Sequence, residues 1–178
     1  MTTTPTARRR ALLAARPASE RASALKERIY ATFTGLAIVA VITSDLVDTE
    51  PLQAFLTLAI GIVGIAAAGF VAEVIAHQVT HGAAPRGVDL RTAARISGGA
   101  LASASIPLLA LGAACFGWLS LETSTLVATV IYVATLALVA VLAVARTPMT
   151  AAQRLGALLV MLAFIALVVI VLVVSKLH

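Results

Sequence analysis

Three ionisable side chains follow one another at helical spacing in an otherwise apolar part of the sequence. Glu73, His77 and His81 are four residues apart, so a helix places them on one face, one turn after another. A carboxylate and neutral imidazoles suit divalent transition metals, and histidine titrates near neutral pH. We therefore predict that this face binds a divalent metal ion through Glu73, His77 and His81, or relays protons through Glu73 and His77.

Two simpler interpretations of this face stay open. The apolar run 54–72 precedes Glu73, so the face begins near the end of a long apolar stretch. In the first interpretation, Glu73 extends to the membrane surface and the histidines are solvated. In the second, the three side chains contact lipid headgroups. The depth of Glu73 in the membrane decides between these interpretations and an ion site.

The composition places this face in an integral membrane protein. The chain has 178 residues, of which 61% are hydrophobic and 12% charged, and its mean hydropathy is +1.04. No water-soluble fold needs so much apolar surface. The sequence also lacks a glycine-rich phosphate loop and a serine or cysteine nucleophile placed beside a base, so we expect no enzymatic activity.

The predicted fold is an all-α bundle of five transmembrane helices. A spanning helix needs about 20 mainly apolar residues. Five such stretches are separated by short polar segments: 29–45, 52–77, 96–119, 124–145 and 153–174. Thr150 and Gln153 form a capping box that predicts the start of the last one. Residues 29–178 thus form one transmembrane domain, preceded by a tail of residues 1–28.

The tail is basic and is expected to lie in the cytoplasm. Near its end, Ala22 and Leu25 alternate with Glu20, Lys26 and Glu27 in a pattern typical of a helix at the membrane interface. The arginines of the tail predict contact with anionic lipids.

The positive charges predict the orientation. All but one of the 13 Lys and Arg residues lie in the tail or in segments 78–95 and 146–154, which share one side of the predicted bundle. Basic flanks stay in the cytoplasm, so we place the N-terminus inside and the C-terminus outside. Topology accounts for the net charge of +5, and no nucleic-acid partner is expected. The excess of Arg, Ala and Val is typical of GC-rich bacterial genomes, which predicts the bacterial cytoplasmic membrane.

Hydroxyl side chains within the spans offer a polar lining. Tyr30 and Thr34, with Ser97 at a similar depth, are predicted to line an inner cavity or to bond neighbouring helices. A stripe on the span 124–145 faces a pore or makes interhelical hydrogen bonds, and it consists of Thr125, Thr129, Tyr132 and Thr135.

Small residues predict where helices approach closely. Gly64 and Ala68 lie on one face of the second span, and Gly98 and Gly99 lie in the third. Such residues pack helices within the bundle or form a two-fold interface, so we expect a homodimer or another homo-oligomer. Pro107 removes a backbone hydrogen bond and predicts a kink in the third span.

The layout of these features resembles the vacuolar iron transporter family. The resemblance rests on five spans, Glu73 in an inward second span, Pro107 in the third, and the stretch Arg154-Leu155-Gly156-Ala157-Leu158. The family's first span carries an Asp-Gly pair where this chain has Thr34-Gly35, and its cytoplasmic metal-binding domain is replaced by a short segment. The resemblance implies a dimer that exchanges divalent metal ions and protons near the membrane midplane.

Two functions from different classes follow from the sequence. The first is a small-cation transporter or channel-like protein, for which a divalent metal ion or the proton is the substrate. The second is a non-transporting structural or accessory subunit of a membrane complex. A hydrated cavity that reaches Glu73 favours the first, and a dry bundle favours the second.

Overall fold

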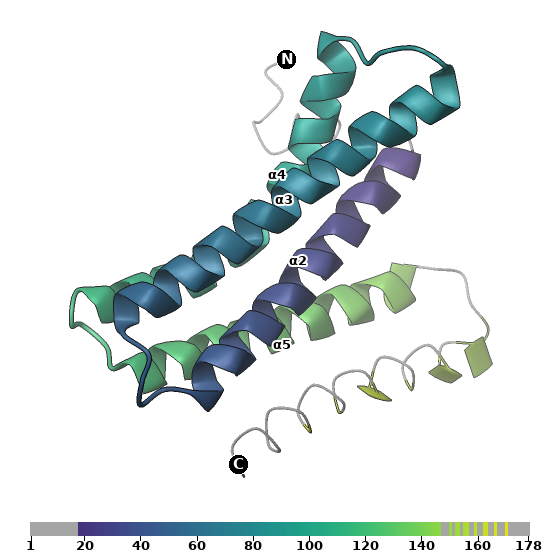
Figure 1. The fold of residues 1–178 in the computed structure, drawn as a ribbon. Helices are drawn as coiled ribbons and strands as arrows, with labels where there is room; N and C mark the ends of the chain where they lie inside the picture. The colour runs from purple at the N-terminus through teal and green to yellow at the C-terminus, as the bar shows by residue number, and fades with distance from the viewer. Residues whose placement is uncertain are drawn as a thin grey trace, which may run out of the picture.

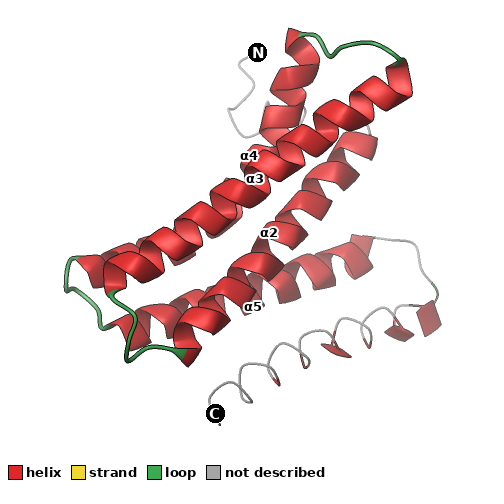
Figure 2. Ribbon diagram, viewed as in Figure 1, coloured by secondary structure: helices red, strands yellow, loops and turns green. Residues whose placement is uncertain are grey.

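The computed structural model describes residues 18–146 and, beyond them, residues 150, 152, 153, 155, 156, 159, 162, 163, 166 and 170. The continuous part forms four α-helices (Figure 1): α2 (Ala18–Ser44), α3 (Pro51–His81), α4 (Gly87–Cys115) and α5 (Leu121–Arg146). The described part of the chain therefore has an all-α fold, as predicted. The connections are short, so consecutive helices run antiparallel (Figure 2).

The connections define the two ends of the bundle. Segments 45–50 and 116–120 lie at one end, here called the Glu50 end, and segment 82–86 lies at the other, here called the Arg86 end (Figure 2). Helices α2 and α4 run from the Arg86 end to the Glu50 end, while α3 and α5 run back.

Three described helical stretches are long and apolar enough to cross a membrane: Pro51–His81, Gly87–Cys115 and Leu121–Leu142. This agrees with a membrane protein. The helix α2 does not join them, because Glu20, Lys26, Glu27 and Arg28 occupy its first half. The expected total of five spans is thus not reached by the described residues, and most of the last predicted span, 153–174, lies outside them. The predicted capping box is present, since Thr150 N donates to Gln153 Oε1 at 3.1 Å.

The helix ends differ from the predicted span ends for local reasons. The helix α3 continues past residue 77 to His81, where Gly82 adopts a left-handed conformation (φ 62°) and donates its N–H to Gln78 O. The helix α4 begins at Gly87, nine residues before the predicted apolar span, because Asp89 Oδ2 accepts a 2.9 Å hydrogen bond from Arg86 N. The predicted boundary between the tail and the first span, at residue 28, does not coincide with a helix end, because α2 continues without a break through this residue.

The core fills the middle of the bundle. Its largest fully buried side chains come from all four helices and include Leu36, Leu58, Ile62, Leu111 and Tyr132. Between lipid-facing helices, such contacts stabilise through close van der Waals packing rather than through removal from water. Toward the Arg86 end a second contact, here called the alanine contact, brings Ala31, Ala66 and Ala100 together, which draws α2, α3 and α4 close.

Close helix approach occurs mostly at glycines other than those predicted. Gly35 lies under Tyr132, Gly61 under Ile38, and Gly112 under Phe55. Gly64 and Gly98 have open space around them among the described atoms, and Ala68 is exposed. Gly99 does contact a neighbour, the side chain of Arg28. The predicted packing positions Gly64, Ala68 and Gly98 therefore face outward from this chain. The buried Pro107 lies inside α4, which continues through it.

Candidate functional site

The predicted ionisable face of α3 lies at the Arg86 end. Glu73 is half-buried, and one turn before it Gly69 is buried against α2. His77 is also half-buried, while His81 is exposed at the end of the helix. The three side chains thus extend from the edge of the bundle interior to its surface.

The helix α4 adds a fourth member to this face. The Oδ2 atom of Asp89 lies 3.6 Å from Nε2 of His77, and the side chains of Asp89 and His77 are 37% and 24% exposed. The His77 ring also stacks on that of His81, with ring centres 4.4 Å apart. We call Glu73, His77, His81 and Asp89 the Arg86-end cluster.

Asp89 was missed as a site residue, and in the structure it also caps the start of α4. It performs both roles, since the oxygen that accepts from Arg86 N is the one that faces His77. The signal was the position of Asp89 after a short turn, which returns α4 along the end of α3.

The cluster is not a multidentate metal site. Among the described residues, no three His, Cys, Asp or Glu side chains are grouped so that they could hold a metal ion. His81 directs Nδ1 toward the backbone carbonyl of His77 at 3.2 Å, which fixes its ring along the helix. The predicted ligand set of Glu73, His77 and His81 therefore does not converge on one point.

A second carboxylate approaches the same end from α2. Glu27 is only 6% exposed, and its Oε2 atom lies 2.5 Å from the point that a Cβ of residue 69 would occupy. Gly69 therefore provides the space for the carboxylate of Glu27. The sequence placed Glu27 on the polar face of an interfacial helix, and this was wrong because α2 turns that side chain into the contact with α3.

Ser97 on α4 is a further buried polar side chain. It is 4% exposed, and its Oγ has no hydrogen-bond partner within the described structure. It lies on the buried face of α4, three residues before Ala100 of the alanine contact. Ser97 was predicted to line an inner cavity or to bond a neighbouring helix. The structure buries it without a hydrogen bond to a described residue, and the cavity stays a prediction.

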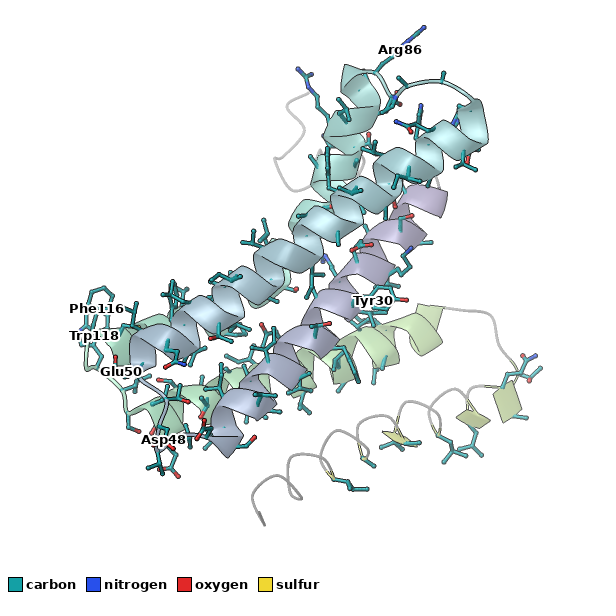
Figure 3. All side chains as sticks on the ribbon, viewed as in Figure 1. Tyr30, Asp48, Glu50, Arg86, Phe116 and Trp118 are labelled. Carbon is teal, nitrogen blue, oxygen red and sulfur yellow. The ribbon has the colours of Figure 1, made fainter. Side chains whose placement is uncertain are left out.

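The remaining predicted hydroxyls are placed differently. Tyr30 is 58% exposed and lies on the side of α2 away from α3 (Figure 3), whereas Thr34 is half-buried. The hydroxyls of the threonine stripe on α5 bond the backbone of their own helix, with Thr129 Oγ1 donating to Thr125 O at 2.8 Å and Thr135 Oγ1 to Ile131 O at 2.7 Å. Tyr132 is fully buried, and its hydroxyl has no partner among the described atoms.

Charge is distributed unequally between the ends of the bundle. Figure 3 shows Asp48 and Glu50 at one end, near Phe116 and Trp118, and Arg86 at the opposite end. Phe116 and Trp118 are 76% and 79% exposed, with ring centres 5.6 Å apart. Exposed aromatic rings of this kind are typical of the membrane interface.

Comparisons with known proteins return no matching family model, no matching curated protein and no matching solved structure. The resemblance to the vacuolar iron transporters therefore stays a prediction, and the function is argued from the geometry of the chain itself.

Proposed function

We propose that this protein moves a small cation across the membrane and that the Arg86-end cluster is where the cation enters or leaves. The observation that carries the proposal is the 3.6 Å approach of His77 Nε2 to Asp89 Oδ2, which joins the ionisable face of α3 to α4. This approach brings an acidic side chain of a second helix to the face that the sequence predicts as a cation site.

The proton is the favoured substrate over a divalent metal ion. A relay needs neighbouring groups that take and release a proton, and His77 stands between the carboxylates of Glu73 and Asp89. The distance between His77 and Asp89 exceeds a hydrogen bond, so one water or a small rotation completes the step. A divalent ion needs several converging ligands, which the described residues do not supply.

The proposal includes a topology of five spans with the Arg86 end in the cytoplasm. Arg86, Arg91 and Arg95 are exposed at this end, whereas acidic residues occupy the Glu50 end. In this topology α2 crosses the membrane with the basic tail beside anionic lipids, the C-terminus is outside, and the membrane is the bacterial cytoplasmic one.

We further propose a homodimer. The small residues Gly64, Ala68, Ala72 and Ala76 form one exposed row along α3, and no described part of the chain covers Gly64. Such rows allow two helices to approach closely in lipid.

The experiment is proton flux into proteoliposomes that contain a pH-sensitive dye. Glu73→Gln should lower the flux at least tenfold, because the variant removes the charge and keeps the shape. His77→Ala should weaken it, and His81→Ala should affect it least because this ring is already at the surface. Glu50→Gln at the opposite end is the matched control and should transport normally. Absence of flux in the wild type at every pH and with every cation tested refutes the proposal.

A second candidate function is a non-transporting accessory subunit. An open apolar groove of about 680 Å³ lies between α2 and α3 near the Glu50 end, lined by residues that include Ile38, Leu52, Leu56 and Ile60. Core side chains from all four helices also pack together in the middle of the bundle. A groove that accepts a partner helix and a packed core both favour assembly over transport, and the flux measurement separates the two functions.

A further inference from the structure

Three helices contribute to one layer just beyond the alanine contact, toward the Arg86 end. Because the helices are antiparallel, one turn in this direction means three or four residues back on α2 and α4 and three or four residues forward on α3. These steps lead to Glu27 on α2, Gly69 on α3 and Ser97 on α4. The layer therefore holds a carboxylate and a hydroxyl beside a residue without a side chain.

Both residues in this layer are largely buried. Glu27 is 6% exposed and Ser97 is 4% exposed. The buried Ser97 hydroxyl has no hydrogen-bond partner among the described residues, and no hydrogen bond or ion pair of the Glu27 side chain is found among them. The carboxylate of Glu27 is held against Gly69, where a larger residue would collide with it. A carboxylate packed between helices without a partner side chain is stabilised by a bound cation or proton.

We propose that Glu27 and Ser97 form a binding site for one monovalent cation, either a proton or Na⁺. The inference rests on the proposed function and names the place where the moving cation resides inside the bundle. The carboxylate supplies one negative charge, which a single monovalent cation balances. The hydroxyl of Ser97 offers lone pairs to Na⁺, or a hydrogen bond to the protonated carboxyl.

The basic residue next to the site does not supply the missing charge. The side chain of Arg28 packs on α4, where its Nε lies 3.3 Å from the point that a Cβ of Gly99 would occupy. Arg28 is exposed overall and forms no ion pair with Glu27 in the part of the chain that the structure describes.

The other packed helices bring one acidic group and no described cation into the layer. On α3, Glu73 lies one turn beyond Gly69 and links the site to the Arg86-end cluster. On α4, Arg91 and Arg95 are exposed. The ionisable side chains described on α5 are Glu122, at the Glu50 end, and Tyr132, in the middle of the core. The described ionisable neighbour of the site on the packed helices is therefore acidic.

The site is tested by labelling the full-length protein in proteoliposomes with a hydrophobic carbodiimide, which reacts with protonated carboxyl groups in apolar surroundings. Labelling of Glu27 is measured by mass spectrometry of its peptide. One arm varies Na⁺ against choline at constant pH and ionic strength, and the other varies pH without Na⁺. If Na⁺ binds, labelling of Glu27 falls at least fivefold with Na⁺. If the proton alone binds, labelling of Glu27 falls with rising pH and does not depend on Na⁺.

Ser97→Ala tests the second ligand. Loss of the hydroxyl should change the condition at which labelling of Glu27 is half-maximal. The Na⁺ concentration at this point should shift roughly tenfold, or the pH by roughly one unit, as expected for one hydrogen bond to a charged group. Ser97→Thr keeps a hydroxyl and should retain protection, which separates ligand loss from misfolding. Ser105→Ala, at an exposed serine of the same helix, is the matched control and should behave as the wild type.

Three results would each overturn the site. Labelling of Glu27 could be equal in all conditions, or Glu73 could be labelled while Glu27 is not. In the third, labelling of Glu27 in Ser97→Ala depends on Na⁺ and pH as it does in the wild type. The outcome is distinct from that of the flux experiment. Cation-dependent protection without flux keeps the site and refutes transport, whereas flux that persists in Glu27→Gln refutes the site and keeps transport.

Discussion

The ring of Tyr132 on α5 lies directly over Gly35 on α2, with its hydroxyl oxygen 2.5 Å from the point that a Cβ of residue 35 would occupy. This contact joins two helices that are far apart in the sequence, in the middle of the core. The tyrosine is fully buried, so its ring is enclosed by the core on this chain.

We expect Gly35→Ala to destabilise the bundle, because the added methyl group overlaps the ring of Tyr132. Overpacking of this kind costs about 1–3 kcal/mol. The measurement is the free energy of unfolding in mixed detergent and SDS micelles, followed by circular dichroism.

Gly98→Ala is the matched control. Gly98 is a helical glycine of α4 with open space around it among the described atoms, and it lies outside the small-residue row of α3. Alanine there should be neutral or stabilising by about 0.5–1 kcal/mol. Equal destabilisation by the two substitutions would contradict the Gly35–Tyr132 contact.

The topology predicts which sites are accessible from outside intact cells. Single cysteines at Glu50 and Glu122 should react with a membrane-impermeant maleimide, and cysteines at Arg86 and Thr147 should not; Thr147 lies outside the described residues. The native Cys115 is exposed near the Glu50 end and must first be replaced by alanine. Labelling of the opposite pair would reverse the proposed orientation.

The exposed small-residue row of α3 predicts the effect of bulk on assembly. Ala68→Leu should lower the dimer fraction in detergent severalfold and leave the unfolding of the monomer unchanged, because Ala68 is exposed on this chain. The measurement is size-exclusion chromatography with light scattering. Ala67→Leu adds the same bulk at an exposed neighbour on a different part of the helix surface and should leave the dimer intact. Ala68→Leu with an unchanged dimer fraction would remove this face from the interface.

The sequence predicts the helices well and their contacts poorly. Apolar runs of suitable length identify α3, α4 and α5, because a membrane requires such runs. The exact ends depend on single residues such as Gly82 and Asp89, which extend α3 and α4 beyond the apolar runs. Helix packing depends on which small residue meets a large side chain, and several candidates of equal size compete along each helix. Close contacts form at Gly35 and Gly69 because Tyr132 and Glu27, which lie on other helices, pack against them.

The candidate site shows the same division. The spacing of Glu73, His77 and His81 is a property of one helix, and the sequence is sufficient to predict that they share a face. The burial of Glu27 and the approach of Asp89 to His77 depend on how α2 and α4 pack on α3. Glu27 lies in a polar stretch of the sequence, which gives no sign that its side chain is buried. Its burial becomes evident only from the contact with Gly69 on another helix.

The last prediction separates the two roles of Asp89, which caps α4 through Arg86 N and faces His77 through the same oxygen. Asp89→Asn keeps an oxygen that can accept from the backbone, and it removes the negative charge beside the imidazole. The free energy of unfolding should therefore change by less than about 0.5 kcal/mol, while proton flux falls severalfold because protonated His77 loses its nearby counter-charge.

Asp89→Ala removes both the cap and the charge, so it should lower the flux by a similar factor and also cost about 1 kcal/mol of stability. Flux in proteoliposomes and unfolding in micelles are measured on the same preparations of the two variants and the wild type. If Asp89→Asn transports normally while Asp89→Ala loses both activity and stability, Asp89 acts only as a cap. The contact with His77 then has no part in proton movement, and the proton passes without Asp89. If Asp89→Asn loses flux at full stability, the charge itself acts on the imidazole, and the relay includes α4 as well as α3.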